Sequence, residues 1–189
     1  MRRQLLVAIF LLPGCTVAPQ PEDCRVHPTS ELWAACLSQS CAACQCLSTP
    51  GEIDAARRTS SDVASLTATL EGGRECQADL AVSLLPTLSG GDLEDVMRAL
   101  GMMASHFPES FLRVVDRGRL DQPRIRRIVR MLPLSVVDND AARLNLVEER
   151  ASALSGVEDP SLIQVRDTTV RDLNEYEQEL RRRIDAKEE

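Results

Sequence analysis

The chain has 189 residues, of which 43% are hydrophobic and 27% charged, and its formal net charge is −7. This length suits one domain or two small ones. The hydrophobic fraction is too high for a disordered chain, and the acidic balance argues against a nucleic-acid-binding protein, which requires a basic surface. We therefore expect a folded protein whose partners do not include nucleic acid.

The N-terminus has the organisation of a bacterial export signal. Arg2 and Arg3 precede an apolar run over residues 5–12, which is too short to cross a bilayer and typical of a signal peptide. The segment Leu12-Pro13-Gly14-Cys15 that follows resembles the lipobox of bacterial lipoproteins. The resemblance implies that residues 1–14 are a cleaved signal peptide and that Cys15 carries diacylglycerol and a further acyl chain such as palmitate.

The residue after the lipidated cysteine indicates where such a protein resides. In enterobacterial lipoproteins an Asp at this position retains the protein in the inner membrane, and here the residue is Thr16. The resemblance therefore implies an outer-membrane anchor with the protein facing the periplasm. Residues 15–28 are expected to form a flexible tether, so that the lipid makes the membrane contact; several acyl chains anchor a protein durably where one does not.

Seven cysteines occur, and the lipid on Cys15 leaves an even number for disulfides. An exported chain with an even set of cysteines is expected to form bridges, although spacing does not choose among the pairings. These bridges would hold only the N-terminal third of the chain, because all six lie between residues 24 and 76. The predicted disulfide cysteines are Cys24, Cys36, Cys41, Cys44, Cys46 and Cys76.

Two other uses of the cysteines stay open at this point. Cys41 and Cys44 have the spacing of a dithiol redox motif. Thiolates from the wider set could instead bind zinc or an iron–sulfur cluster; that set comprises Cys36, Cys41, Cys44, Cys46 and Cys76. Because the flanking sequence looks helical, without the βαβ surroundings of a redox domain, we favour structural bridges and predict no metal and no cofactor.

Helical periodicity runs through the rest of the chain. Apolar residues recur at spacings of three and four, bounded by Ser or Asp caps, Pro and Gly. No convincing alternating pattern of a β-strand appears. We predict an all-α fold in which disulfide-stapled N-terminal helices (29–86) precede a helical bundle or stacked helical hairpins (87–189), the two parts forming separate units or one domain. The expected helices cover residues 30–44, 50–70, 74–85, 92–107, 111–117, 123–132, 140–154 and 160–186.

A faint internal recurrence hints at stacked hairpins, and coincidence is the alternative explanation. Leu85-Pro86 and Ala104-Ser105 recur 47 residues later as Leu132-Pro133 and Ala151-Ser152. This period lies near that of repeat proteins built from helical pairs.

The candidates for chemistry are few. The two histidines, His27 and His106, lie outside any metal or catalytic motif, and no nucleophile, phosphate-binding or zinc-protease pattern is present. We therefore predict that the protein is not an enzyme. Four arginines form a basic face on one short helix, which we interpret as a contact for anionic lipid headgroups or an acidic partner, or as a solvated face balanced by carboxylates. They are Arg124, Arg126, Arg127 and Arg130.

These features favour a lipoprotein that acts as a non-catalytic adaptor, scaffold or assembly accessory for another envelope protein. The alternatives are a thiol redox or metal-binding lipoprotein that uses the cysteine cluster, and a carrier of an apolar ligand between the helices.

The intact mass of the protein extracted from membranes tests the export signal. We expect a mass that lacks residues 1–14, includes the acyl groups on Cys15, and is reduced by the hydrogens lost in three disulfides. A mass that retains Met1 with every thiol reduced would contradict both inferences at once.

Overall fold

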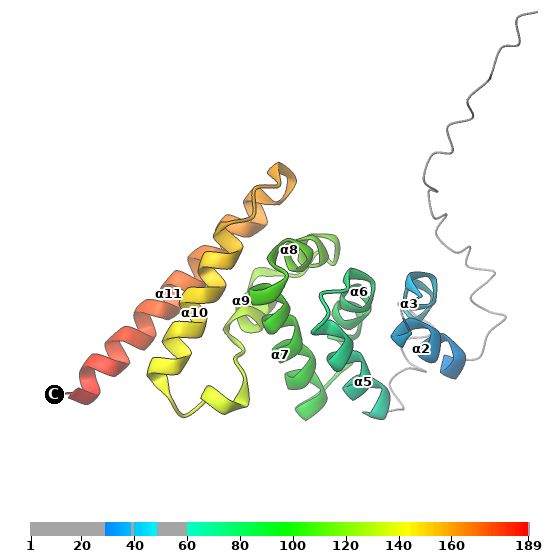
Figure 1. The fold of residues 1–189 in the computed structure, drawn as a ribbon, viewed down its shortest axis with the longest axis horizontal. Helices are drawn as coiled ribbons and strands as arrows, with labels where there is room; N and C mark the ends of the chain where they lie inside the picture. Colours follow the sequence, from blue (N-terminus) through cyan, green and yellow to red (C-terminus); the bar gives the residue numbers. More distant parts are fainter. Residues whose placement is uncertain (1–28, 39, 49–59, 189) are drawn as a thin grey trace, which may run out of the picture.

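The computed structural model describes residues 29–38, 40–48 and 60–188 (Figure 1). All the regular structure in these ranges is helical, which confirms the predicted all-α fold. Besides two short 3₁₀ turns, η1 (Leu134–Val136) and η2 (Pro160–Leu162), the described α-helices are α2 (Thr29–Leu37), α3 (Cys41–Leu47), α5 (Ser60–Leu70), α6 (Glu75–Leu84), α7 (Gly90–His106), α8 (Pro108–Arg117), α9 (Gln122–Arg130), α10 (Asp140–Ser155) and α11 (Ile163–Glu188).

The helices form a row of stacked hairpins rather than a closed bundle (Figure 1). In one layer α5 packs on α7 and α7 on α10, while in the other α3 packs on α6 and α6 on α8. The short helix α9 lies between α7 and α11. The α2–α3 pair stands at one end of the row and the long α10–α11 hairpin at the other, so each pair mainly contacts its neighbours, as in helical repeat proteins.

The 47-residue offset relates two successive helix pairs. Adding 47 to the bounds of α6 gives 122–131, against 122–130 for α9, and adding it to α7 gives 137–153, against 140–155 for α10. Buried positions correspond as well: Leu100 matches Val147, and Ala104 matches Ala151. The offset therefore places residues in equivalent structural positions along the row.

One continuous hydrophobic core runs from Leu32 in α2 to Leu180 in α11 and crosses the expected division at residue 86. At the end of the row, α11 exposes a polar outer face that includes Asp167, Arg171 and Asn174, which suits a terminal helix that closes a stack. Within the described part of the chain, none of the helices combines the length and the hydrophobicity needed to cross a membrane.

The prediction of a single helix over residues 30–44 is wrong, because α2 ends at Leu37 and a separate helix, α3, begins at Cys41. Cys36 and Cys44 form a disulfide between α2 and α3, with their Cα atoms 4.8 Å apart. In a continuous helix, eight residues would separate these atoms by about 12 Å, beyond the reach of a disulfide. Ser40 begins the new helix: its Oγ accepts a hydrogen bond from the Ala43 N–H at 3.3 Å.

Other predicted boundaries differ in detail. The expected helix start at Thr49-Pro50 lies outside the described residues, but the predicted stop after α5 is confirmed, with Gly73 in the left-handed region at φ +69°. Helix α7 begins at Gly90 rather than Asp92. The apolar spacing of the predicted helix 92–107 places Phe107 on its core-facing side, and this is wrong: Phe107 lies at the junction of α7 and α8 and is 37% exposed.

Arg150 is the most unusual residue of the core. Its side chain is fully buried, and no carboxylate pairs with it among the described residues. Its Nη1 donates hydrogen bonds to the carbonyl oxygens of Val129 and Met131 at the C-terminal end of α9, and its Nε donates to Ser105 Oγ of α7 at 2.9 Å. The guanidinium thereby joins α10 to α9 and α7, and the negative end of the α9 dipole partly offsets its burial.

Burial lowers the pKa of Arg150 to about 10, so the group remains protonated at neutral pH. Space for its head group depends on Gly101: a Cβ there would lie 2.7 Å from the Ile128 carbonyl oxygen and 3.2 Å from Arg150 Nη1. The close approach of α7 to the end of α9 therefore requires a residue without a side chain.

We expect Arg150→Met to lower the free energy of unfolding by about 2–4 kcal/mol, because it leaves two buried carbonyl oxygens without donors. The residue at the equivalent position 47 residues earlier is Met103, which is also buried, so a Met side chain suits this position in the row. Urea unfolding followed by circular dichroism measures the change. Arg124→Met on the exposed face of α9 is the control, expected to change stability by less than about 0.5 kcal/mol; equal midpoints for the two variants would contradict the structural role of Arg150.

Candidate functional site

The structure pairs most of the predicted disulfide cysteines. Cys36 bonds Cys44, and Cys41 bonds Cys76 of α6 with their Cα atoms 5.2 Å apart. Cys46 is also disulfide-bonded, to a partner outside the described residues. Cys41 and Cys44 therefore do not pair with each other as a dithiol motif would, and thiols in bridges are not free to act as thiolate ligands. Cys15 and Cys24 lie outside the described residues.

The predicted basic face of α9 is divided by the fold. Arg126 Nη2 lies 2.7 Å from Oδ1 of the buried Asp172 in α11, and Arg130 pairs with Glu179 at 3.3 Å while lying over the Tyr176 ring. Arg124 and Arg127 point into solvent. Half of the face thus holds α9 against α11, and contact with an anionic surface stays a prediction that rests on the other two arginines.

An open groove of about 750 Å³ lies where two turns of the row meet. One wall is the junction between α7 and α8, and the other is the end of α10 with the turn that leads to η2. The helix ends that form both walls are packed into the common core, which places the groove on a rigid frame. Its lining residues are Phe107, Pro108, Glu109, Ser110, Ser152, Ala153, Gly156, Val157, Glu158 and Asp159.

Phe107 is held in its half-exposed position by the neighbouring α5–α6 turn. It is the residue between α7 and α8, where Pro108 begins the second helix. Its ring lies against Gly73 in the α5–α6 turn, so closely that a Cβ on Gly73 would overlap the ring. One face of the ring is therefore supported by the neighbouring hairpin, while the residue remains accessible at the edge of the groove.

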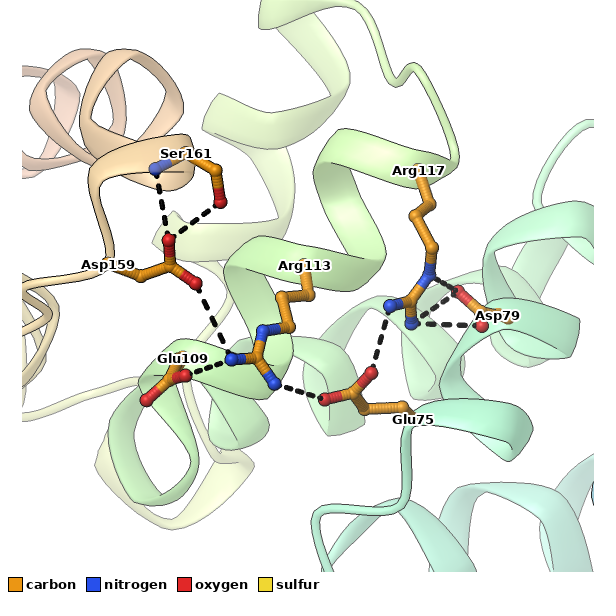
Figure 2. Close-up of polar contacts among 7 residues, drawn as sticks. All are labelled: Glu75, Asp79, Glu109, Arg113, Arg117, Asp159 and Ser161. Carbon is orange, nitrogen blue, oxygen red and sulfur yellow. Dashed lines mark hydrogen bonds and ion pairs between the residues drawn. The ribbon is translucent and has the colours of Figure 1, made fainter. Parts of the chain in front are cut away.

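A row of charged side chains extends from the groove along α8 to α6 (Figure 2). Arg113 stands at its centre, with Nη2 contacting Glu109 one turn earlier and Asp159 Oδ2 at 3.5 Å, and Nη1 lying 3.6 Å from Glu75 Oε1. Arg113 therefore links α8 to both neighbouring hairpins. Because these side chains are exposed or half-buried, each pair contributes little to stability by itself.

Arg117 continues the row one turn further along α8. Its Nη1 lies 2.9 Å from Glu75 Oε2 and its Nη2 3.0 Å from Asp79 Oδ2. Burial raises the pKa of the Asp79 carboxyl above its ordinary value, while the hydrogen bonds and charge of Arg117 act in the opposite direction. Glu75 accordingly joins the two arginines into one continuous network (Figure 2).

Asp159 fixes the turn that forms the second wall. One of its carboxylate oxygens accepts hydrogen bonds from the Ser161 N–H at 3.0 Å and the Ser161 hydroxyl at 2.7 Å. These bonds, and then the nearby Arg113, lower the pKa of Asp159. The carboxylate caps η2, whereas the sequence predicted the start of the final helix at residue 160; α11 begins after this turn, at Ile163. Asp159 also adds negative charge to the groove.

The groove and the adjoining network form a net acidic surface. Five carboxylates face two guanidiniums, a formal net charge of −3; the acids are Glu75, Asp79, Glu109, Glu158 and Asp159. Glu158 is exposed, and no ion pair of Glu158 occurs among the described residues. A groove that combines apolar lining residues with acidic residues at its rim can bind a cationic, partly apolar group.

Sequence reasoning did not identify this site. Helical spacing assigned Phe107 to the apolar face of a helix, and Asp159 was interpreted only as the start of the final helix. The sequence does contain one indication, the Phe107-Pro108 pair. Because a helix normally ends before a proline, the preceding Phe107 lies at the end of the helix rather than on its core-facing side. Nothing in the sequence showed that the α10–α11 turn would lie opposite it.

No family model matches the chain, and comparisons with curated proteins and with solved structures gave no match.

We expect Asp159→Asn to reduce the acid sensitivity of the protein. Because the pKa of Asp159 is lowered by folding, its charge stabilises the folded state above the ordinary value of 3.8, and this contribution is lost as the pH falls through the folded pKa. Urea midpoints measured from about pH 6 down to about pH 3 should fall less steeply in the variant. Glu94→Gln, at an exposed position of α7, should follow the unaltered protein; an identical slope for Asp159→Asn would contradict the assignment.

Proposed function

We propose that this protein is a lipid-anchored adaptor of the bacterial envelope that holds another envelope protein in the groove beside Phe107. The observation that carries the proposal is the groove itself, an open concavity of about 750 Å³ with a half-exposed aromatic residue at its edge. Aromatic residues in such positions are frequent anchors of protein interfaces.

The proposed location rests on the sequence at Cys15 and Thr16. Disulfides between α2 and α3 and between α3 and α6 support an exported protein, because such bridges persist in oxidising compartments and are rare in the cytosol. In this proposal the lipid holds the chain at the outer membrane and the helical row extends into the periplasm.

The chemistry of the groove supports binding rather than catalysis. Its lining offers two apolar wall segments, serine hydroxyls and carboxylates, but no histidine, cysteine or lysine. Glu109 and Asp159 already contact Arg113, and Asp159 also holds Ser161. The lining therefore offers Ser110 and Ser152 no histidine that would activate a hydroxyl.

Site-specific photo-crosslinking in cells tests the adaptor function. A photoreactive residue at Ser152, an exposed position in the groove, should crosslink a discrete partner, whereas the same residue at Ala64, exposed on α5, should not. The Ser152 crosslink should fall severalfold in a Phe107→Ala background, because the apolar contact is removed. Circular dichroism confirms that this background is folded.

Two results would contradict the proposal. One is equal crosslinking from Ser152 and Ala64, which would mean that the groove is not a preferred contact. The other is a Ser152 crosslink that Phe107→Ala leaves unchanged in a folded protein.

A further inference from the structure

The groove combines two kinds of recognition surface. Phe107, Pro108, Ala153 and Val157 supply an apolar region, of which Val157 is buried beneath the surface and Phe107 remains accessible. Among the described residues with large exposed hydrophobic side chains, Phe107 is aromatic while Leu134, Val137 and Ile163 are aliphatic. An apolar side chain of a ligand can therefore rest against a ring that Gly73 supports from behind.

The rim adds negative charge that the protein itself leaves uncompensated. Arg113 forms ion pairs with three carboxylates, those of Glu75, Glu109 and Asp159. Glu158 stands on the rim without an ion pair among the described residues. With the adjoining Asp79 and Arg117, the surface keeps a formal net charge of −3, so an anionic lipid surface or nucleic acid would be repelled from it.

A second copy of this chain is a poor match to the same surface. Three of its arginines are already engaged, Arg126 with Asp172, Arg181 with Glu148, and Arg183 with Asp140. Arg124 and Arg127 remain in solvent on α9, so a second copy offers this pair of cations. The chain as a whole, however, carries a net charge of −7, which opposes self-association through an acidic face.

We infer that the occupant of the groove is a basic segment of a different protein, with one aromatic or aliphatic side chain placed against Phe107 and a lysine or arginine placed at Glu158. This inference rests on the proposed adaptor function and specifies the chemistry of its partner. Charge complementarity sets the choice of partner and the rate of encounter, while the apolar contact provides most of the affinity.

Peptide display on the full chain tests the inference. Peptides selected from a random library should be enriched in lysine and arginine and contain a large apolar residue. Their affinity should fall about tenfold on Glu158→Lys, where attraction becomes repulsion, and about tenfold on Phe107→Ala. Glu94→Lys makes the same charge change at an exposed position of α7 and should leave affinity within about twofold.

The salt dependence and a charge exchange complete the test. Binding to the unaltered protein should weaken as sodium chloride increases, since screening reduces attraction between exposed charges. Peptides whose lysines and arginines are replaced by glutamate should bind Glu158→Lys better than they bind the unaltered chain.

Selection of acidic or uncharged peptides, of none, or of basic peptides that bind the Glu158→Lys and Phe107→Ala variants normally would overturn the inference. A Ser152 crosslink to a second copy of this chain, or to a partner segment without basic residues, would also overturn it. In the last case a crosslink that depends on Phe107 leaves the adaptor function standing, so the two proposals fail separately.

Discussion

A single buried cation sets the geometry of the C-terminal half of the molecule. Arg150 reaches from α10 to the final carbonyl oxygens of α9 and to Ser105 near the end of α7. A charge enclosed in this way is costly unless every donor finds an acceptor, and the carbonyls at the end of α9 would themselves be unsatisfied without it. The guanidinium and the helix end therefore require each other, and the three helices can pack only in an arrangement that brings them together.

The groove is a consequence of that arrangement. Ser105 lies two residues before Phe107, and Arg150 lies two residues before Ser152, so the contact between them holds the two walls at a defined separation. The ion pairs around Arg113 then set the charge of the groove surface and contribute little to the packing of the helices. Because they distribute two arginines over several carboxylates, they leave the rim with excess negative charge, concentrated at Glu158.

The opposite end of the row is held by different means. Helices α2 and α3 have nine and seven residues, shorter than the length at which an isolated helix is stable in water. Bridges from Cys36 to Cys44 and from Cys41 to Cys76 attach them to each other and to α6, which restricts the unfolded chain and compensates for a small core. The α10–α11 hairpin contains no cysteine; its helices of 16 and 26 residues pack along each other, and its ends are joined through Asp140 and Lys187.

Local sequence was sufficient to predict most helices and several of their ends. Helical periodicity, the Asp121 cap of α9 and the glycines after α5 act within one or two turns, so they can be interpreted without the rest of the fold. The even set of cysteines after Cys15 likewise predicted bridges in the N-terminal part. The faint recurrence at 47 residues was only a hint, and the bounds of the helices established the equivalence of α6–α7 with α9–α10.

Tertiary packing determined contacts between helices that the periodicity of the sequence does not contain. The break between α2 and α3 follows from a disulfide whose partners had to meet, and the burial of Arg150 from acceptors that another helix supplies 19 to 21 residues away. The same holds for Arg126, which the sequence assigned to a basic face and which forms an ion pair with Asp172 in the folded protein. The sequence by itself thus determined helices and cysteine bridging, and its lipid address remains a prediction. The groove exists only because two turns separated by about 50 residues, at Phe107 and Val157, come together, and no local pattern records the distance between them.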